Sequence, residues 1–257
     1  MLRNPEQTKK AVIGWIQKYF EQYAPGASAV IGISGGKDSS VAAALCVEAL
    51  GKERVIGVMM PDGMQSDIAD SRTLVSYLEI PHMEINIQKI KGAYEDVLRS
   101  VPLITEICGQ PPLSKQAQIN LPPRIRMSVL YVVAQTLTGG GLVVNTCNRS
   151  EDYVGYSTKY GDAAGDFSPL AGFTVREVLQ LGEVLSIPEH LLEKEPSDGL
   201  SGMPDEEKLG FTYEILDNYI ETGICEDSET KRKIDLFHKN NLHKLQPIPF
   251  YHKSDSE

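Results

Sequence analysis

The sequence predicts an α/β protein with a parallel sheet and helices on both faces. Its strand candidates are short and almost continuously apolar, which is typical of strands that are buried on both sides. These runs cover residues 28–33, 54–60, 82–87 and 142–146. Stretches with apolar residues at helical spacing separate them, and strands that alternate with helices form βαβ units.

The predicted elements are clearly separated along the chain. The first helix, over 5–23, carries apolar residues such as Val12 and Ile16 at helical spacing and ends before Pro25-Gly26. Further helices are predicted over residues 41–50, 67–78, 92–100, 123–137, 174–185, 188–192, 205–219 and 227–240. The stretches that lack periodicity are predicted to be loops, and they are residues 102–112, 155–172 and the tail from 242.

Composition excludes several classes of function. The 257 residues include 25 Lys and Arg against 35 Asp and Glu, a formal net charge of −10, which argues against binding to nucleic acid or to an anionic membrane. No apolar run approaches the roughly 20 residues of a membrane-spanning helix, and the N-terminus does not resemble a signal peptide. The length favours a single domain over residues 1–257, since about 100–200 residues is usual for one domain.

The cysteines give no sign of a disulfide framework or a zinc site. There are four, at scattered positions without paired spacing: Cys46, Cys108, Cys147 and Cys225. Free thiols are typical of a cytoplasmic protein, which is the location we expect.

The most informative segment joins the first strand to the next helix. Residues 32–40 read G-I-S-G-G-K-D-S-S. Glycines allow a ligand to approach the backbone, and the following helix N-terminus offers free N–H donors to a phosphate. Asp38 would repel a phosphate unless a cation such as Mg²⁺ lay between them. The segment therefore predicts a phosphate site that uses a metal, although a plain glycine turn with an Asp cap would read similarly.

Two other nucleotide or hydrolase motifs fit this segment less well. Its spacing is not that of the ordinary P-loop, G-x-x-x-x-G-K-[ST]. Residues 32–36 match the G-x-S-x-G elbow of serine hydrolases, but no histidine follows in a distinctive loop after an apolar strand. We therefore disfavour a serine hydrolase.

A family resemblance sharpens the prediction. Residues 34–39, S-G-G-K-D-S, resemble the PP-loop of the ATP pyrophosphatases, which cleave ATP between its α- and β-phosphates. The blocks N-L-P-P-R-I-R-M at 120–127, N-T-C-N-R-S-E at 145–151 and G-Y-S-T-K-Y-G-D at 155–162 are similar to those of the NAD synthetase family, and so are K-E-P-S-D at 194–198 and D-E-E-K-L-G at 205–210. This resemblance implies the Rossmann-like adenine-nucleotide α-hydrolase fold. It also implies ATP-dependent amidation of deamido-NAD by ammonia, in a homodimer without a glutaminase domain.

The resemblance also assigns roles to residues. Those implied to bind ATP are Gly32, Ile33, Ser34, Gly35, Gly36, Lys37, Asp38, Ser39, Thr146 and Ser197. Those implied to hold deamido-NAD are Arg124, Lys159, Asp166, His243 and Lys244. Asp38 and Glu151 would bind Mg²⁺. Ser34 and Thr146 follow two of the predicted strands, and ligands of parallel sheets gather at the carboxyl ends of strands.

The chemistry requires an activated carboxylate. Transfer of AMP to the nicotinate carboxylate creates a mixed anhydride with a good leaving group, and Mg²⁺ stabilises the departing pyrophosphate. Ammonia then displaces AMP, and Asp162 is our candidate to accept its proton. Asp38 and Asp162 are thus the predicted catalytic residues.

Departures from the family pattern leave alternatives open. Val175 stands where the family usually has a phosphate-reaching lysine, so that either Arg176 substitutes for it or the ATP site lacks one cation. Pro122-Pro123 interrupts the first block, and Arg126 on an apolar helix is read as structural. The alternative functions are another PP-loop amidotransferase or tRNA thiolase, and a non-catalytic adenine-nucleotide binding module.

Overall fold

The computed structural model describes residues 1–65, 67–108, 113–194 and 205–251. Its helices and strands, in chain order, are α1 (Pro5–Tyr23), β1 (Ser28–Gly32), α2 (Lys37–Leu50), η1 (Lys52–Arg54), β2 (Val55–Met59), α3 (Ile68–Tyr77), β3 (His82–Glu84), α4 (Gln88–Arg99), α5 (Pro102–Cys108), α6 (Lys115–Thr136), β4 (Gly141–Val143), α7 (Arg149–Val154), α8 (Val175–Val184), α9 (Glu189–Leu192), α10 (Asp205–Leu209), α11 (Tyr213–Thr222), α12 (Ser228–Asn241) and η2 (Leu242–Lys244).

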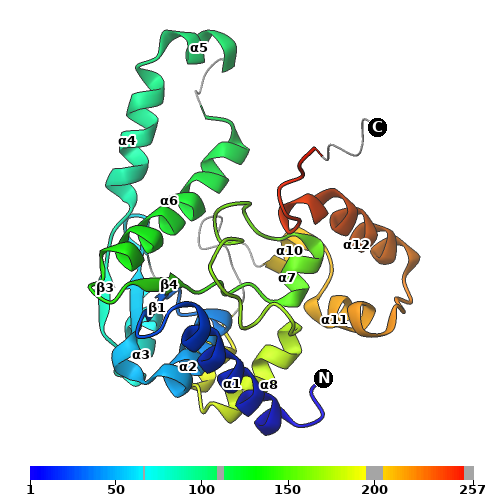
Figure 1. Ribbon diagram of the computed structural model, residues 1–257. Coiled ribbons are helices and arrows are strands. Elements are labelled where there is room, and N and C mark those ends of the chain that lie inside the picture. The colour runs from blue at the N-terminus through cyan, green and yellow to red at the C-terminus, as the bar shows by residue number, and fades with distance from the viewer. Residues whose placement is uncertain (66, 109–112, 195–204, 252–257) are drawn as a thin grey trace.

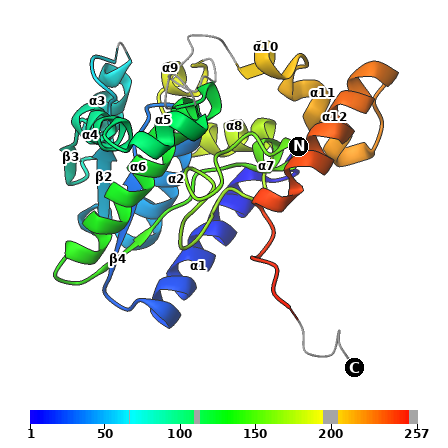
Figure 2. The same cartoon turned by 90° about the horizontal axis from the view of Figure 1, so that it is seen from above.

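The strands form one parallel sheet in the order β3-β2-β1-β4. Side chains alternate between its two faces, as the period of a strand requires. In β1, Ala29 and Ile31 pack with α1, α2 and α8, whereas Val30 packs with α6 on the other face. The predicted parallel sheet with helices on both faces is confirmed (Figures 1 and 2).

The order in which strands are added to the sheet reverses at β1. From β1 it proceeds to β2 and β3 on one side, and α6 then returns it to β4 on the other side. A crevice therefore opens between the carboxyl ends of β1 and β4, which is the usual ligand position in open α/β sheets.

Besides the apolar packing on the two faces of the sheet, a third apolar cluster lies beyond the carboxyl ends of the strands. α7, α11 and α12 enclose a smaller apolar cluster that includes Phe211, Leu216 and Ile234, at the right of Figure 1. The loop over 155–172 runs between this cluster and the sheet, and it contains no helix or regular strand, as predicted, although Phe167 forms an isolated parallel bridge with Val144.

Several element predictions need correction. The tail from 242 begins with η2 rather than a loop, the strand predicted over 82–87 ends at Glu84, and the helix predicted over 92–100 begins at Gln88. Residues 102–108 form α5 rather than a loop. α6 begins at Lys115 instead of 123, because Ser114 caps it by accepting a hydrogen bond from the Ala117 N–H at 3.2 Å. The single helix predicted over 205–219 is two helices, because Gly210 adopts a positive φ of 76° and Thr212 caps a new start.

No helix among the described residues is long and apolar enough to span a bilayer.

Candidate active site

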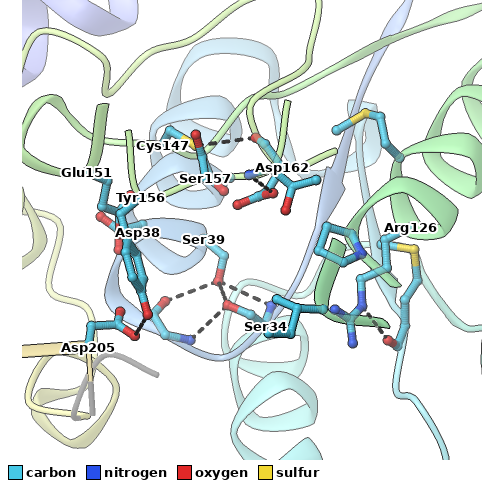
Figure 3. Close-up of a pocket in the computed structure, with 18 of the residues that line it drawn as sticks. Ser34, Asp38, Ser39, Arg126, Cys147, Glu151, Tyr156, Ser157, Asp162 and Asp205 are labelled. Atoms are coloured by element: carbon cyan, nitrogen blue, oxygen red, sulfur yellow. Dashed lines mark hydrogen bonds between the residues drawn. The ribbon is translucent and has the colours of Figure 1, made fainter. Parts of the chain in front are cut away.

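A cleft of about 800 Å³ opens at the crevice between β1 and β4. Its walls come from segments far apart in the chain: the loop after β1, the first half of α6, the segment after β4, the 154–162 loop, the start of α10 and η2. Figure 3 shows Asp38, Glu151 and Asp205 on one side of this cavity and Arg126 on the opposite side.

The loop after β1 lies in this cleft and is held by its own serines. The hydroxyls of Ser34 and Ser39 are 3.1 Å apart, and the Ser39 hydroxyl also donates to the Gly36 carbonyl at 3.1 Å. Gly36 precedes α2 and has no side chain to cap it, so the first N–H groups of α2 remain available to a ligand. This geometry can bind a phosphate at the positive end of the helix.

Gly35 is required for a different reason. It adopts a φ of +75°, and a Cβ at this position would lie 2.6 Å from the Ser71 nitrogen in α3. Of residues 32–39, Gly35 alone does not line the cleft, because it faces α3. The loop is thus pinned between the sheet and α3.

Asp38 is at the centre of a charged cluster. Its Oδ2 accepts a hydrogen bond from the Lys37 ammonium at 2.8 Å, and its Oδ1 accepts one from the Asn148 amide at 2.9 Å. Asn148 also forms a capping box with Glu151 at the start of α7. The cap therefore brings the Glu151 carboxylate towards Asp38, and Figure 3 shows the two on the same wall of the cavity.

Burial, followed by the charge of Asp38, raises the pKa of Glu151 well above its usual range. A buried carboxylate whose ionisation is disfavoured by a second carboxylate beside it forms a place where a divalent cation is favoured. The buried Tyr213 hydroxyl lies near the same carboxylates and has no hydrogen-bond partner among the described residues.

These residues fit Mg²⁺ bound together with a substrate phosphate. No group of three or more His, Cys, Asp and Glu side chains in the described part of the chain is placed to hold a metal by itself. Mg²⁺ commonly uses one or two carboxylates and takes its other ligands from phosphates and water. Asp38 and Glu151 would supply the protein ligands.

Residues 154–158 and Asp162 supply a further part of the cleft lining. Asp162 faces the cleft, and desolvation by the surrounding protein raises its pKa, although the Thr158 N–H donates to its Oδ1 at 2.8 Å. Thr146 lines the cleft just beyond β4. Cys147 lies between them, and burial raises the pKa of its thiol.

Comparison with known proteins decides the family. The sequence model of the NAD synthase family matches residues 8–248. The NH(3)-dependent NAD(+) synthetase of Thermoplasma acidophilum is 36% identical over 236 residues, which are 89% of this chain and 92% of that protein. The enzyme of the same name from Alkaliphilus metalliredigens is 36% identical over 93% of this chain and 96% of its own. The chain belongs to the NAD synthase family.

Two solved structures have the same architecture. NMN synthetase from Francisella tularensis aligns with a TM-score of 0.84 and 30% identity, and the match covers 96% of this chain and 98% of that one. NAD⁺ synthetase from Burkholderia pseudomallei aligns with a TM-score of 0.75 and 27% identity over 95% and 90% of the two chains.

The residues predicted to hold deamido-NAD fall into two groups in this structure. Lys244 lines the cleft, where its ammonium donates to the carbonyls of Gly155 at 2.7 Å and Ser157 at 2.9 Å. Arg124, Lys159 and His243 lie outside the cleft lining and are linked to one another. The Arg124 Nε donates to the Lys159 carbonyl at 3.2 Å, and the Lys159 ammonium donates to the His243 carbonyl at 3.0 Å.

Asp166 also lies outside the cleft lining. Its Oδ2 accepts a hydrogen bond from the Val143 N–H at 2.7 Å, and its Oδ1 accepts one from the Tyr131 hydroxyl at 3.3 Å. The carboxylate therefore holds the end of β4 in this chain, and a role in substrate binding stays a prediction.

The question raised by Val175 is answered by geometry. Val175 is buried, and the Arg176 guanidinium turns away from the cleft to form ion pairs with Asp217 and Glu221. Arg176 therefore does not supply the missing cation. Ser197 lies outside the described residues.

Several cleft residues of this NAD synthase family member were missed by sequence reasoning. Arg126, read as structural, lines the cleft, and its Nε donates to the Met60 carbonyl at 3.0 Å. Asp205 accepts a hydrogen bond from the Tyr156 hydroxyl at 2.9 Å, and Lys194 and Lys208 also line the cleft. Sequence signals were present, since Arg126, Lys194, Asp205 and Lys208 stand in the family blocks at 120–127, 194–198 and 205–210. Asn148 had a local one, because N-x-x-E is a recognisable helix start.

Proposed function

We propose that this chain is an ammonia-dependent NAD synthetase that amidates deamido-NAD at the expense of ATP and releases AMP and pyrophosphate. The observation that carries this is the juxtaposition of the loop after β1 with Asp38 and Glu151, at the switch point of a chain that belongs to the NAD synthase family. Retention of both carboxylates favours an enzyme over a nucleotide-binding module.

Different residues of the cleft would bind the phosphates and the metal ion. The α2 N-terminus and the Ser34 and Ser39 hydroxyls would hold the phosphates of ATP, next to Thr146 on the neighbouring strand end. Bound Mg²⁺ would neutralise charge on the leaving pyrophosphate. Asp38 and Glu151 would hold that ion, and their hydrogen bonds to Asn148 fix the spacing between them.

Amidation also requires a proton acceptor in the cleft. Ammonia carries one proton too many after it attacks the acyl-adenylate, and a carboxylate with a raised pKa suits its removal. Asp162 has that property and faces the same cleft as the loop after β1. We therefore assign it as the general base.

A second acid substrate, nicotinate mononucleotide, is favoured by two observations. The NMN synthetase structure aligns at a TM-score of 0.84, against 0.75 for the NAD⁺ synthetase from Burkholderia pseudomallei. Within this chain, Lys244 alone of the residues predicted to hold the dinucleotide lines the cleft. A single chain thus offers fewer contacts to a second nucleotide than the prediction assumed.

The test gives the purified protein Mg-ATP and ammonium with either acid. Chromatography should show AMP and NAD with deamido-NAD, or AMP and nicotinamide mononucleotide with nicotinate mononucleotide, and the ratio of kcat/KM identifies the substrate. AMP formation with neither acid would reject both candidates. Nucleotide binding without pyrophosphate release would indicate a binding module.

Nitrogen source, assembly and location complete the proposal. The relatives that match along most of their length are described as NH(3)-dependent, which supports free ammonia. We also propose a homodimer and a cytoplasmic location. Free thiols at all four cysteines support that location.

A further inference from the structure

Lys37 is an unusual lysine, because it is buried in the loop that we assign to phosphate binding. Its side chain is only 5% exposed, and lysines are rarely buried unless they are paired. The partner is its own neighbour, since the ammonium donates to the Asp38 Oδ2 at 2.8 Å. A cation therefore already occupies one oxygen of a proposed metal ligand.

Within the described part of the chain, the charged groups that act on Lys37 are the carboxylates of Asp38, Glu151 and Asp205. Burial alone would lower the pKa of Lys37, but Asp38, Glu151 and Asp205 together raise it above the ordinary value. The face of the Tyr213 ring lies 5.8 Å from the ammonium and adds a weaker attraction. Lys37 thus remains charged and balances the Asp38–Glu151 pair.

We propose that Lys37 is a built-in counter-cation that makes metal binding at Asp38 and Glu151 depend on nucleotide. This inference rests on the proposed function, because it takes those two carboxylates as the metal ligands. A divalent ion that reaches the empty cleft meets an ammonium beside Asp38, and like charges at this range repel strongly in a partly buried site. A triphosphate brings the negative charge that offsets this repulsion.

The lysine side chain suits such an exchange. Its ammonium is a point charge on a flexible stem with three donors, so it can leave Asp38 for a phosphate oxygen without loss of its charge. Lys37 lines the same cleft as Ser34 and Ser39, so a phosphate bound by this loop would lie close to the Lys37 ammonium. Arg176 cannot take this part, because it is paired with Asp217 and Glu221 away from the cleft.

The experiment measures Mn²⁺ binding by electron paramagnetic resonance at about pH 8, with and without a non-hydrolysable ATP analogue. The wild-type chain should bind Mn²⁺ at least about tenfold more tightly with the analogue than without it. Lys37→Met should tighten Mn²⁺ binding to the nucleotide-free chain at least about tenfold and shrink the effect of the analogue. Lys37→Arg, which keeps the charge, should behave like the wild type.

A matched control removes the same charge elsewhere in the cleft. Lys115 is exposed, lines the cleft and has no ion pair among the described residues, so Lys115→Met should leave nucleotide-free Mn²⁺ affinity within about twofold. Lys37→Gln replaces Lys37→Met if circular dichroism shows that the methionine variant is unfolded.

The outcomes separate this inference from the proposed function. Equal or weaker nucleotide-free Mn²⁺ binding by the charge-removing variant, Lys37→Met or Lys37→Gln, would overturn the inference, even if amidation is observed. Tighter binding in the absence of nucleotide would support it, even if neither nicotinate acid is a substrate. Tighter binding by Lys115→Met to the same extent would also overturn it, since the effect would then be one of total cleft charge.

Discussion

Asp162 links the geometry of a single side chain to the pH dependence of the reaction. Desolvation raises its pKa, and a general base must be unprotonated, so the rate should fall as the pH drops through that raised value. Asp162→Asn should lower kcat at least about tenfold at about pH 8 and remove this pH limb. The measurement is kcat against pH at a fixed concentration of NH3. An unchanged kcat would remove Asp162 from the mechanism.

The raised pKa of Asp162 should also make the free energy of unfolding depend on pH. Since its pKa is higher in the folded chain, the folded state binds more protons between the ordinary and the raised value, and the free energy of unfolding falls as the pH rises through that window. Asp162→Asn, which is neutral throughout, should melt at a higher temperature than the wild type above the window and equally below it. Thermal denaturation at two pH values checks this, and a less stable variant at high pH would contradict it.

Lys244 and His243 are neighbours with different surroundings. Lys244 donates to two carbonyls of the cleft wall, whereas His243 is exposed and its Nδ1 contacts only the Asn240 carbonyl, at 3.0 Å. We expect Lys244→Met to raise the KM for the acid substrate about tenfold or more and His243→Ala to change it less than about threefold. Initial-rate kinetics measure both. A large effect of His243→Ala would mean that the acid extends outside the cleft of one chain.

At the scale of elements, the contact between the loop after β1 and α3 makes two adjacent glycines unequal. A Cβ on Gly35 would lie 2.6 Å from the backbone of Ser71, whereas one on Gly36 would meet only the Ser34 hydroxyl, at 3.6 Å. Gly35→Ala should therefore destabilise the chain by about 2 kcal/mol or more and abolish nucleotide binding. Gly36→Ala is the matched control and should lose much less stability. Denaturant unfolding and nucleotide titration test the pair, and equal losses would contradict this packing.

Periodicity predicted the elements where one local signal dominates, and it failed where packing overrides that signal. Gly51 ends α2 as expected, and β1, β2 and β3 lie inside their apolar runs, whereas β4 begins at Gly141, one residue before its run. α6 instead runs through Pro122 and Pro123, each of which lacks the N–H that the helix would use. Ile125 and Leu130 pack its second half on the sheet, and the Thr158 hydroxyl holds Asn120 in its first half at 2.7 Å. Those contacts come from distant parts of the chain, so sequence could not reveal them.

The same reason limits prediction of the site. The loop after β1 was identifiable because its chemistry is contiguous in sequence. Arg126 and Asp205 stand in family blocks, but their place in the site was not predicted, because they reach the cleft only through the course of α6 and the position of α10. Asp166 illustrates the converse, since a charged residue in a glycine-rich loop is used to hold Val143 at the end of β4.

At the scale of the whole molecule, the net charge of −10 coexists with a cleft suited to anions. Among the described residues that line the cleft, six side chains are cationic and five are acidic: Lys37, Lys115, Arg126, Lys194, Lys208 and Lys244 against Asp38, Asp67, Glu151, Asp162 and Asp205. The acidic surface therefore surrounds a local site whose charge is close to balanced. Local placement of charge, rather than total charge, decides which ligands such a cleft accepts.

The surface of the fold also bears on the oligomeric state of the protein. α4 and α5 form an arm that stands away from the sheet (Figure 1), and its exposed apolar side chains include Val97, 64% exposed, and Ile107, 73% exposed. Exposed apolar side chains gathered on one projection favour burial against another protein surface. In the proposed homodimer, we expect a second copy to cover this arm.

Light scattering during gel filtration should then give twice the chain mass of 28.3 kDa. The double substitution Val97→Glu and Ile107→Glu should give the single-chain mass, because two carboxylates would be desolvated without partners in the interface. Leu236→Glu is the control, since it adds the same charge to an exposed apolar position on α12, away from the arm. If only the arm variant is monomeric and also loses affinity for the acid substrate, the interface contributes to the acid site, and the exposed Arg124 and half-buried Lys159 become the residues to substitute next. If the arm variant stays dimeric, the arm is not the interface and the second copy binds elsewhere.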